Sequence, residues 1–367
     1  MKVTTIGLDL AKNVFQIHGV DECGRAVLRK QLKRQQLLEF FVRLPACLIG
    51  MEACGSAHHW ARKLQSLGHQ VKLMAPQYVK AYVKTNKNDV ADAEAICEAV
   101  TRPNMRFVAV KSIEQQSVLS LHRVREGFVK ARTAQANQIR GLMAEMGLSM
   151  PKGIGHITSR VPELIEDASV ELPASFRQLM DMLVAHFNVL DAQVRHMEQQ
   201  ILQWHKVNPD SRRLAQVPGI GPITASALVA SVGDAHNFES GRQLAAWLGL
   251  VPKQRSSGGK QALLGISKRG DAYLRKLLVH GARAVQRVQA QSAQKAIASN
   301  DPACQWLAAL GARRHKNVAT VALANKNARI AWALLAHQRT YEAGHAGAGT
   351  AGLAKSQSKC ENKPTRP

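Results

Sequence analysis

Short apolar runs separated by polar residues dominate the first hundred residues of the chain. Each run is brief, rich in Ile, Val or Leu, and typical of a buried strand, whereas other stretches repeat apolar residues at helical spacing. The predicted strands are residues 3–11, 13–20, 25–32, 47–53 and 70–76, and the predicted helices are residues 37–44, 56–68 and 87–100. Three strands followed by alternating helices and strands predict one α/β domain over residues 1–108.

The apolar period changes in the middle of the chain. Residues 112–147 contain no proline, and residues 173–207 repeat apolar residues every third or fourth position over about four heptads. We therefore predict two long helices that form an antiparallel coiled-coil arm over residues 109–208. An ordinary helical bundle packed on the core is the alternative. An arm implies a partner, most simply a second copy of the protein, and so a homo-oligomer.

A turn rich in proline and glycine opens the third predicted domain, residues 209–340, which reads as mostly α-helical. Gly219 and Gly221 lie one residue apart between two segments of helical period. Glycines let the backbone turn sharply, and the following helix offers N–H groups to a phosphate. This pattern predicts a helix-hairpin-helix that grips the nucleic-acid backbone, with a plain interhelical turn as the alternative.

A basic segment follows this turn. Nine basic residues and one acid, Asp271, lie between Arg242 and Arg283. Within it, Ser256 and Ser257 precede two glycines and read as a flexible loop, for which an ordinary surface turn is the alternative. The cations that we expect to contact phosphates are Lys253, Arg255, Lys260, Lys268, Arg269 and Arg275.

The overall charge indicates a globular protein that binds polyanions. The chain has 50 Lys+Arg against 26 Asp+Glu, a formal net charge of +24. Such an excess on a folded chain favours DNA or RNA, because phosphate neutralisation releases counterions. No apolar run is long enough to span a membrane, and the first residues lack the basic-then-apolar order of a signal peptide. We expect a cytoplasmic protein with a disordered tail over residues 341–367.

Four acidic residues in the first quarter carry the candidate chemistry. Asp9 and Glu52 lie at the ends of two predicted strands, and Asp89 and Asp92 are three apart on a predicted helix. Residues at i and i+3 share a helix face, so these two carboxylates can point at one place. Oxygen ligands of this kind suit Mg²⁺, or Mn²⁺, and two such ions can assist attack at a phosphodiester. Ordinary solvated acids are the alternative reading.

Together these motifs resemble the DEDD transposases of the insertion sequence 110/1111 family. The resemblance is collinear from about Val3 to Val285 and includes the acids, the long helical middle, the Gly219 turn and the basic segment. It implies an RNase H-like (RuvC-like) first domain, a coiled-coil region and a C-terminal transposase domain. The order of predicted strands and helices in residues 1–108 agrees with that fold by analogy of topology.

The resemblance also implies roles for particular residues. Asp9, Glu52, Asp89 and Asp92 map to a Mg²⁺-binding tetrad, and a serine that attacks DNA covalently maps to Ser257, with Ser256 as the alternative. It further implies recombination guided by a structured RNA that the element encodes, the bridge RNA. We therefore expect a recombinase that excises and inserts its own mobile element.

Two other function classes remain open from the sequence. A RuvC-type junction-resolving nuclease would use the same acids with water as the nucleophile. A non-catalytic nucleic-acid-binding protein would use only the predicted hairpin and the basic segment, and would have no need of the four acids.

Overall fold

The chain forms two compact units, residues 1–113 and 114–367. The computed structural model describes residues 2–84, 88–294 and 302–343. The predicted disordered tail, from residue 344 onward, lies outside these described residues. Among the described helices, none is long and apolar enough to cross a membrane.

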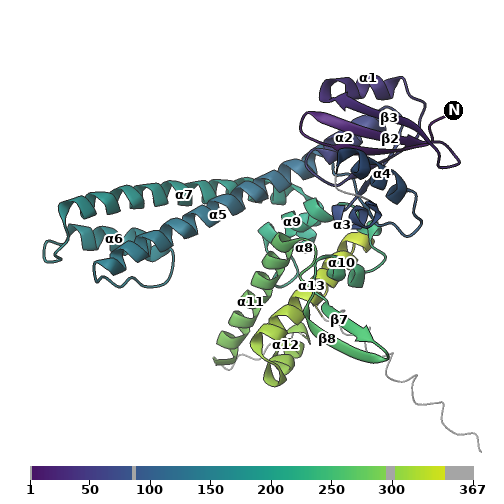
Figure 1. Cartoon of the computed structure of the whole chain (residues 1–367). Helices are drawn as coiled ribbons and strands as arrows, with labels where there is room; N and C mark the ends of the chain where they lie inside the picture. The colour runs from purple at the N-terminus through teal and green to yellow at the C-terminus, as the bar shows by residue number, and fades with distance from the viewer. Residues whose placement is uncertain (1, 85–87, 295–301, 344–367) are drawn as a thin grey trace, which may run out of the picture. The chain divides into compact units, whose positions relative to one another are not determined.

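A six-stranded mixed sheet organises the first unit (Figure 1). The strands are β1 (Thr5–Leu10), β2 (Val14–Val20), β3 (Ala26–Lys33), β4 (Leu48–Glu52), β5 (Gln70–Met74) and β6 (Phe107–Val108). Their order is β3-β2-β1-β4-β5-β6, in which β1, β4 and β5 are parallel and the other pairs are antiparallel. This arrangement confirms the five predicted strands and is consistent with an RNase H-like domain.

Helices cover both faces of this sheet. They are α1 (Leu37–Val42), α2 (Ala57–Ser66), α3 (Pro76–Val79) and α4 (Asp89–Val100). Ile6 and Leu8 point to the face where Leu37 and Trp60 complete one apolar core. The opposite face of β1 carries Gly7, and α4 packs there, because successive residues of a strand alternate between faces.

Two glycines bring α4 close to the sheet. A Cβ at Gly7 would lie 2.1 Å from the Ala93 carbonyl oxygen, and one at Gly50 would lie 2.7 Å from the Val100 Cβ. Any larger residue would push the helix outward. The Cys97 Sγ donates to the Thr5 carbonyl oxygen at 3.8 Å, so the later turns of α4 lie toward the start of β1. The first turn of α4 therefore lies toward the end of β1.

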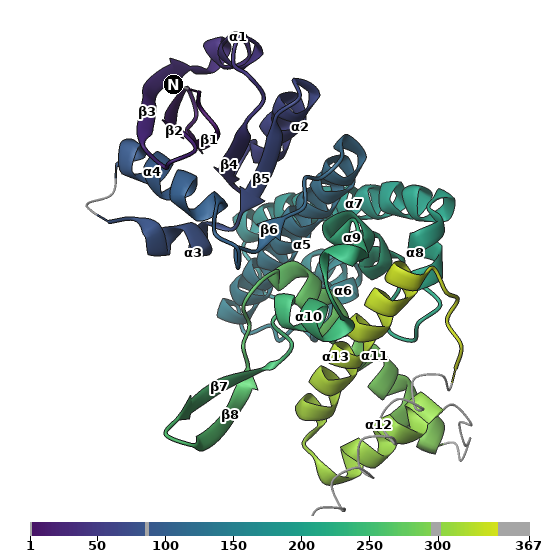
Figure 2. The ribbon, with the colours of Figure 1, turned by 90° about the vertical axis from the view of Figure 1, so that its right-hand side faces the viewer.

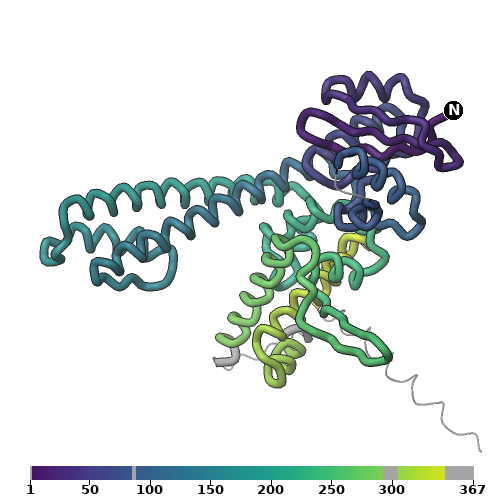
Figure 3. Tube along the Cα trace, viewed as in Figure 1, coloured from purple at the N-terminus to yellow at the C-terminus, as the bar shows by residue number. Residues whose placement is uncertain are grey.

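Two long helices open the second unit. Helix α5 (Ile113–Glu145) and helix α7 (Ala174–Val207) confirm the predicted long helices, and a short helix that was not predicted, α6 (Gly155–Glu166), lies between them in the chain. The two long helices run side by side in Figures 1 and 3. Arg125 of α5 pairs with Glu198 of α7 at 2.5 Å, and Arg132 pairs with Asp191. Pairing of later α5 residues with earlier α7 residues shows that the helices are antiparallel.

The remaining helices of this unit share one apolar core. They are α8 (Pro209–Leu214), α9 (Pro222–Val232), α10 (Gly241–Trp247), α11 (Ala272–Gln294), α12 (Pro302–Arg313) and α13 (Lys316–His337). Residues from all six contribute to that core, among them Leu228, Leu278 and Leu323.

A β-hairpin replaces the flexible serine loop that the sequence analysis predicted. Strands β7 (Pro252–Ser257) and β8 (Lys260–Ile266) pair antiparallel, and the ribbon extends away from the helices in Figure 2. Gly258 and Gly259 have φ values of 54° and 76°. Two consecutive positive φ angles make the tight turn that joins hairpin strands, and glycine adopts them without strain. Ser256 and Ser257 therefore lie in a strand, not in a loop.

Candidate active site

Asp9 and Glu52 lie on neighbouring strands at the same edge of the sheet. Strands β1 and β4 are parallel, and Leu8 pairs with Met51, so the next residue of each strand is an acid. Asp9 is two residues after Gly7, and Glu52 is two residues after Gly50. Both side chains therefore project from the face that α4 covers. The two acids are half-buried.

Cys54 follows Glu52 by two residues and was not among the predicted site residues. Burial raises the pKa of its thiol, and the negative charges of Glu52 and Asp9 raise it further. The backbone also holds Cys54 near Glu52, because the Cys54 N–H donates to the Glu52 carbonyl oxygen at 2.8 Å. The position of Cys54, two residues after the acid that ends β4, was the sequence signal that could have identified it.

Asp89 and Asp92 occupy the first turn of α4. Asn88 caps the helix, because its side-chain oxygen accepts a hydrogen bond from the Ala91 N–H at 2.8 Å. Asp89 is exposed and Asp92 is half-buried. The positive end of the helix dipole stabilises both carboxylates.

The structure places the four acids as two pairs, one on adjacent strands and one in the first turn of α4. The described residues contain no group of three or more His, Cys, Asp or Glu side chains close enough to hold a metal ion. The tetrad therefore stays a prediction. The donor chemistry nevertheless suits a hard divalent cation, because carboxylate oxygens are the ligands that such a cation prefers.

The register of the β7–β8 ribbon separates the two candidate serines. Ser257 pairs with Lys260 and Arg255 pairs with Ala262, so Ser257, Lys260 and Arg255 share one face of the ribbon. Ser256 lies on the other face, where the Gln254 side-chain amide donates to its Oγ at 3.0 Å. Every residue of β7 is exposed. The hydroxyl of Ser257 thus lies with two cations, and that of Ser256 lies with an amide.

The predicted hairpin at residues 217–222 joins α8 to α9. Gly219 has a φ of 89°. A Cβ added to Gly281 of α11 would lie only 1.8 Å from the Gly219 carbonyl oxygen, so the turn and α11 pack closely here. The Asn327 amide also donates to the Pro218 carbonyl oxygen at 2.8 Å. Gly221, by contrast, is exposed and forms the N-cap of α9. Gly219 serves the packing of the turn, and Gly221 faces solvent.

The cations predicted to contact phosphates differ in exposure and in their hydrogen bonds within the protein. Lys253, Arg255 and Lys260 are exposed on the ribbon, and Lys268 and Arg269 are exposed in the segment that follows it. Arg275 is half-buried. Its guanidinium donates to the carbonyl oxygens of Leu248, at 3.0 Å, and Arg269, at 3.1 Å. These bonds give Arg275 a local structural role.

Two family models match most of the described chain. Residues 6–147 match the DEDD transposase model of the IS110 type, and residues 211–297 match the model described as Transposase IS116/IS110/IS902 family. The first match contains the sheet with all four acids, and the second contains the Gly219 turn and the β7–β8 ribbon.

Individual relatives extend the similarity over almost the whole length. The chain is 52% identical over 345 residues to a probable family 20 transposase of Pseudomonas aeruginosa, covering 94% of this chain and 100% of that protein. It is 44% identical to the transposase for insertion sequence element IS1111A of Coxiella burnetii, covering 93% and 92%. It is also 25% identical to the pilin gene-inverting protein of Moraxella bovis, covering 76% and 81%. On this evidence the chain belongs to the IS110 family of insertion-sequence transposases and is an enzyme that recombines DNA.

Proposed function

We propose that this transposase forms a covalent protein–DNA intermediate through Ser257 during excision and insertion of its own element. The observation that carries the proposal is the position of Ser257 on the ribbon face that also presents Arg255 and Lys260. Two cations beside a hydroxyl attract a phosphate and stabilise the charge that develops on it during attack. Ser256, on the amide face, lacks both features.

The chemical step follows from these groups. The Ser257 Oγ attacks the phosphorus, a new P–O bond forms to the serine, and the bond to one sugar oxygen breaks. The serine proton leaves to solvent or a base, and the departing sugar oxygen takes up a proton. Attack by the sugar hydroxyl of another strand reverses the chemistry and joins the DNA. Arg255 and Lys260 neutralise the phosphate oxygens in both directions.

The acids complete the proposal for the first unit. Asp9, Glu52, Asp89 and Asp92 would hold a divalent cation, Mg²⁺ or Mn²⁺, which would supply Lewis-acid chemistry toward phosphate oxygens. Membership of a DEDD family supports the use of a divalent metal. The shared sheet edge of Asp9 and Glu52, and the dipole of α4 at Asp89 and Asp92, support this set of ligands.

Substitution of Ser257 by Ala is the experiment that tests the nucleophile. The variant should lose the covalent protein–DNA species and all recombination, because nothing replaces a missing nucleophile. Ser256→Ala is the matched control, one residue away and equally exposed, and it should keep both. Mass spectrometry of a trapped complex would locate the adduct. An adduct on Ser256, or cleavage at an unchanged rate by Ser257→Ala with free ends, would contradict the proposal; the latter would favour a RuvC-type nuclease that uses water.

A second test addresses the metal. Asp9→Asn keeps the size of the side chain but removes its charge, so strand cleavage in Mg²⁺ should fall below detection while DNA affinity changes little. Asp21→Asn is a suitable control, because Asp21 is a half-buried acid that accepts hydrogen bonds from the Cys23 and Arg25 N–H groups in a turn. Full recombination by Asp9→Asn would refute the metal site.

We also propose that α5 and α7 form a coiled-coil arm that joins copies of the chain.

We further propose that a structured RNA encoded by the element guides this reaction. Family membership and the net charge of +24 support a second polyanion besides DNA. Ribonuclease treatment of the purified, active complex should abolish recombination at the element's target. Unchanged, site-specific recombination after such treatment would remove the guide from the proposal.

A further inference from the structure

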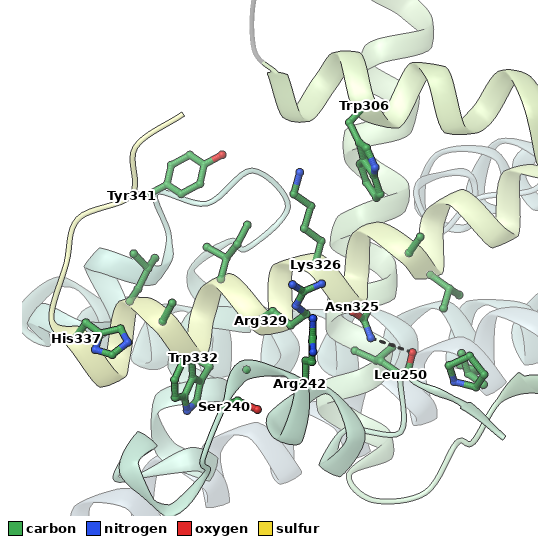
Figure 4. A pocket seen from close by; sticks show the side chains of 18 of the residues that line it. Ser240, Arg242, Leu250, Trp306, Asn325, Lys326, Arg329, Trp332, His337 and Tyr341 are labelled. Atoms are coloured by element: carbon green, nitrogen blue, oxygen red, sulfur yellow. Dashed lines mark hydrogen bonds between the residues drawn. The ribbon is translucent and has the colours of Figure 1, made fainter. Parts of the chain in front are cut away.

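A groove of about 1810 Å³ lies in the second unit between α10, α12, α13 and β8. Its lining is mostly apolar and includes Leu264 and Ile266 from β8 and Ile330 from α13. Four cations and one acid interrupt this apolar lining, namely Arg242, Lys326, Arg329, Arg339 and Glu342. Figure 4 labels Arg242, Lys326 and Arg329.

Two of these cations lie beside each other for a structural reason. Gly241 begins α10 so close to α13 that a Cβ there would lie 2.9 Å from the Arg329 main-chain oxygen. Arg242, the next residue, is therefore held next to Arg329, and Figure 4 shows the two side chains near each other. Neither guanidinium has a hydrogen bond or an ion pair within the described part of the chain. Two like charges that are held together favour an anion between them.

An aromatic ring lies on the same groove. Trp306 of α12 lines it, and the Lys326 Nζ lies 4.6 Å from the centre of the indole. Trp332, which also lines the groove, is engaged differently, because its Nε1 donates to the carbonyl oxygens of Ala235 and Phe238 at 3.1 Å each. The Trp306 indole instead faces the Lys326 ammonium, so a base stacked on this ring would lie beside a cation.

We propose that this groove binds a single strand of DNA, with a phosphate between Arg242 and Arg329 and a base against Trp306. Paired cations with a neighbouring aromatic ring are the features by which proteins hold single strands. DNA is the strand concerned because β8 lines the groove and also pairs with the strand that carries Ser257. At about 3.3 Å per residue, the six residues of β7 span roughly 20 Å between the groove and the serine. Only the identification of the bound strand as DNA rests on the proposed function of Ser257.

Binding of a short labelled oligothymidylate, measured by fluorescence anisotropy, tests the phosphate position. Arg242→Ala and Arg329→Ala should each raise the Kd about tenfold and reduce the slope of log Kd against log salt by about 0.7, the value for one phosphate contact. Arg287→Ala is the matched control, an exposed arginine of α11 outside the groove. Equal effects in the control and the groove variants would overturn the proposal.

Substitutions of Trp306 test the base position. Trp306→Phe should keep most of the affinity and Trp306→Ala should lose about tenfold, because stacking needs a ring. Photo-crosslinking with an iodouracil-containing DNA strand should label the peptide that contains Trp306. Crosslinks confined to other peptides, or tighter binding of the matched oligouridylate, would overturn the assignment to DNA. No strand is cut in these assays, so a failure of Ser257 to form an adduct would leave their outcome unchanged.

Discussion

Single atoms decide how closely α4 approaches the sheet. Gly7→Ala would place a methyl group 2.1 Å from the Ala93 carbonyl oxygen and 2.4 Å from the Cys97 N. Neither backbone group can move alone, so the helix must shift and carry Asp89 and Asp92 with it. We expect a loss of several kcal/mol of stability, about 3 by analogy with overpacked cores, together with a loss of cleavage.

Gly141→Ala provides the control for this substitution. A Cβ at Gly141 of α5 meets nothing within 4 Å, so this variant should be slightly more stable, by about 0.5–1 kcal/mol. Urea denaturation followed by circular dichroism would measure both variants. Wild-type stability in Gly7→Ala would show that α4 does not pack as described.

The two glycines of the hairpin at residues 217–222 should respond differently to substitution. Gly219→Ala meets a φ of 89° and atoms of Gly281 at 3.1 Å, so it should destabilise the second unit. Gly221→Asp meets no atom within 4 Å and keeps an ordinary φ of −81°. It should leave stability unchanged and weaken DNA binding irrespective of sequence, because the carboxylate repels a phosphate at the start of α9. Unaltered affinity of Gly221→Asp in a filter-binding assay would count against the proposed helix-hairpin-helix.

At the scale of elements, a buried histidine joins three helices. The His122 side chain of α5 is 1% exposed, with its Nδ1 3.0 Å from the Tyr273 Oη of α11 and its Nε2 3.1 Å from the Ser226 Oγ of α9. Ser226 donates its proton to the Pro222 carbonyl oxygen at 2.7 Å, so it accepts from His122. A neutral imidazole in this position would carry its proton on Nε2 and accept from the Tyr273 hydroxyl at Nδ1.

Burial lowers the pKa of His122 from 6.5 to about 4, and the positive charge of Arg125 adds to the effect. A proton then binds the unfolded chain more readily than the folded one. The stabilising contribution is complete above pH 6.5 and is lost as the pH falls toward 4, and it amounts to about 3 kcal/mol. We expect the urea midpoint of the wild type to fall more between pH 7 and pH 5 than that of His122→Gln. Parallel curves for the two proteins would contradict this assignment.

The elements also show what the sequence could and could not predict. The strands that carry Asp9 and Glu52 were predicted correctly, because their apolar runs are short and the carboxyl ends of parallel strands meet at one edge. The position of Asp89 and Asp92 depends on how α4 crosses the sheet, which no periodicity encodes. The β7–β8 ribbon was missed because its exposed strands lack an apolar alternation, although the Gly258–Gly259 pair was a hairpin signal. The groove was missed because Arg242 and Arg329 are far apart in the chain.

At the scale of the whole molecule, the α5–α7 pair should determine the oligomeric state. The first part of α5 and the last part of α7 pack within the second unit, where His122 contacts Ser226 and Arg125 pairs with Glu198. A deletion of residues 134–189 with a short turn in their place keeps both contacts and removes only the outer helices. We expect this variant to stay folded and monomeric.

Light scattering of the shortened protein would measure its mass, and circular dichroism would show that the remaining helices are intact. Replacement of the same residues by an unrelated antiparallel helical hairpin is the control for length. A multimer of undiminished mass would show that the copies associate elsewhere.

The exposed β7–β8 hairpin can lower the solubility of the protein. A two-stranded ribbon leaves both outer edges open to pairing with another chain, and β8 presents Leu263 and Leu264 at 68% and 47% exposure. Lys253, Arg255 and Lys260 oppose such edge-to-edge association, because like charges on two ribbons repel. The same lysines and arginine thus act as gatekeepers against aggregation before any DNA is bound. Neutralising them should make the protein precipitate as well as bind DNA less tightly, so turbidity must be recorded alongside affinity in every such variant.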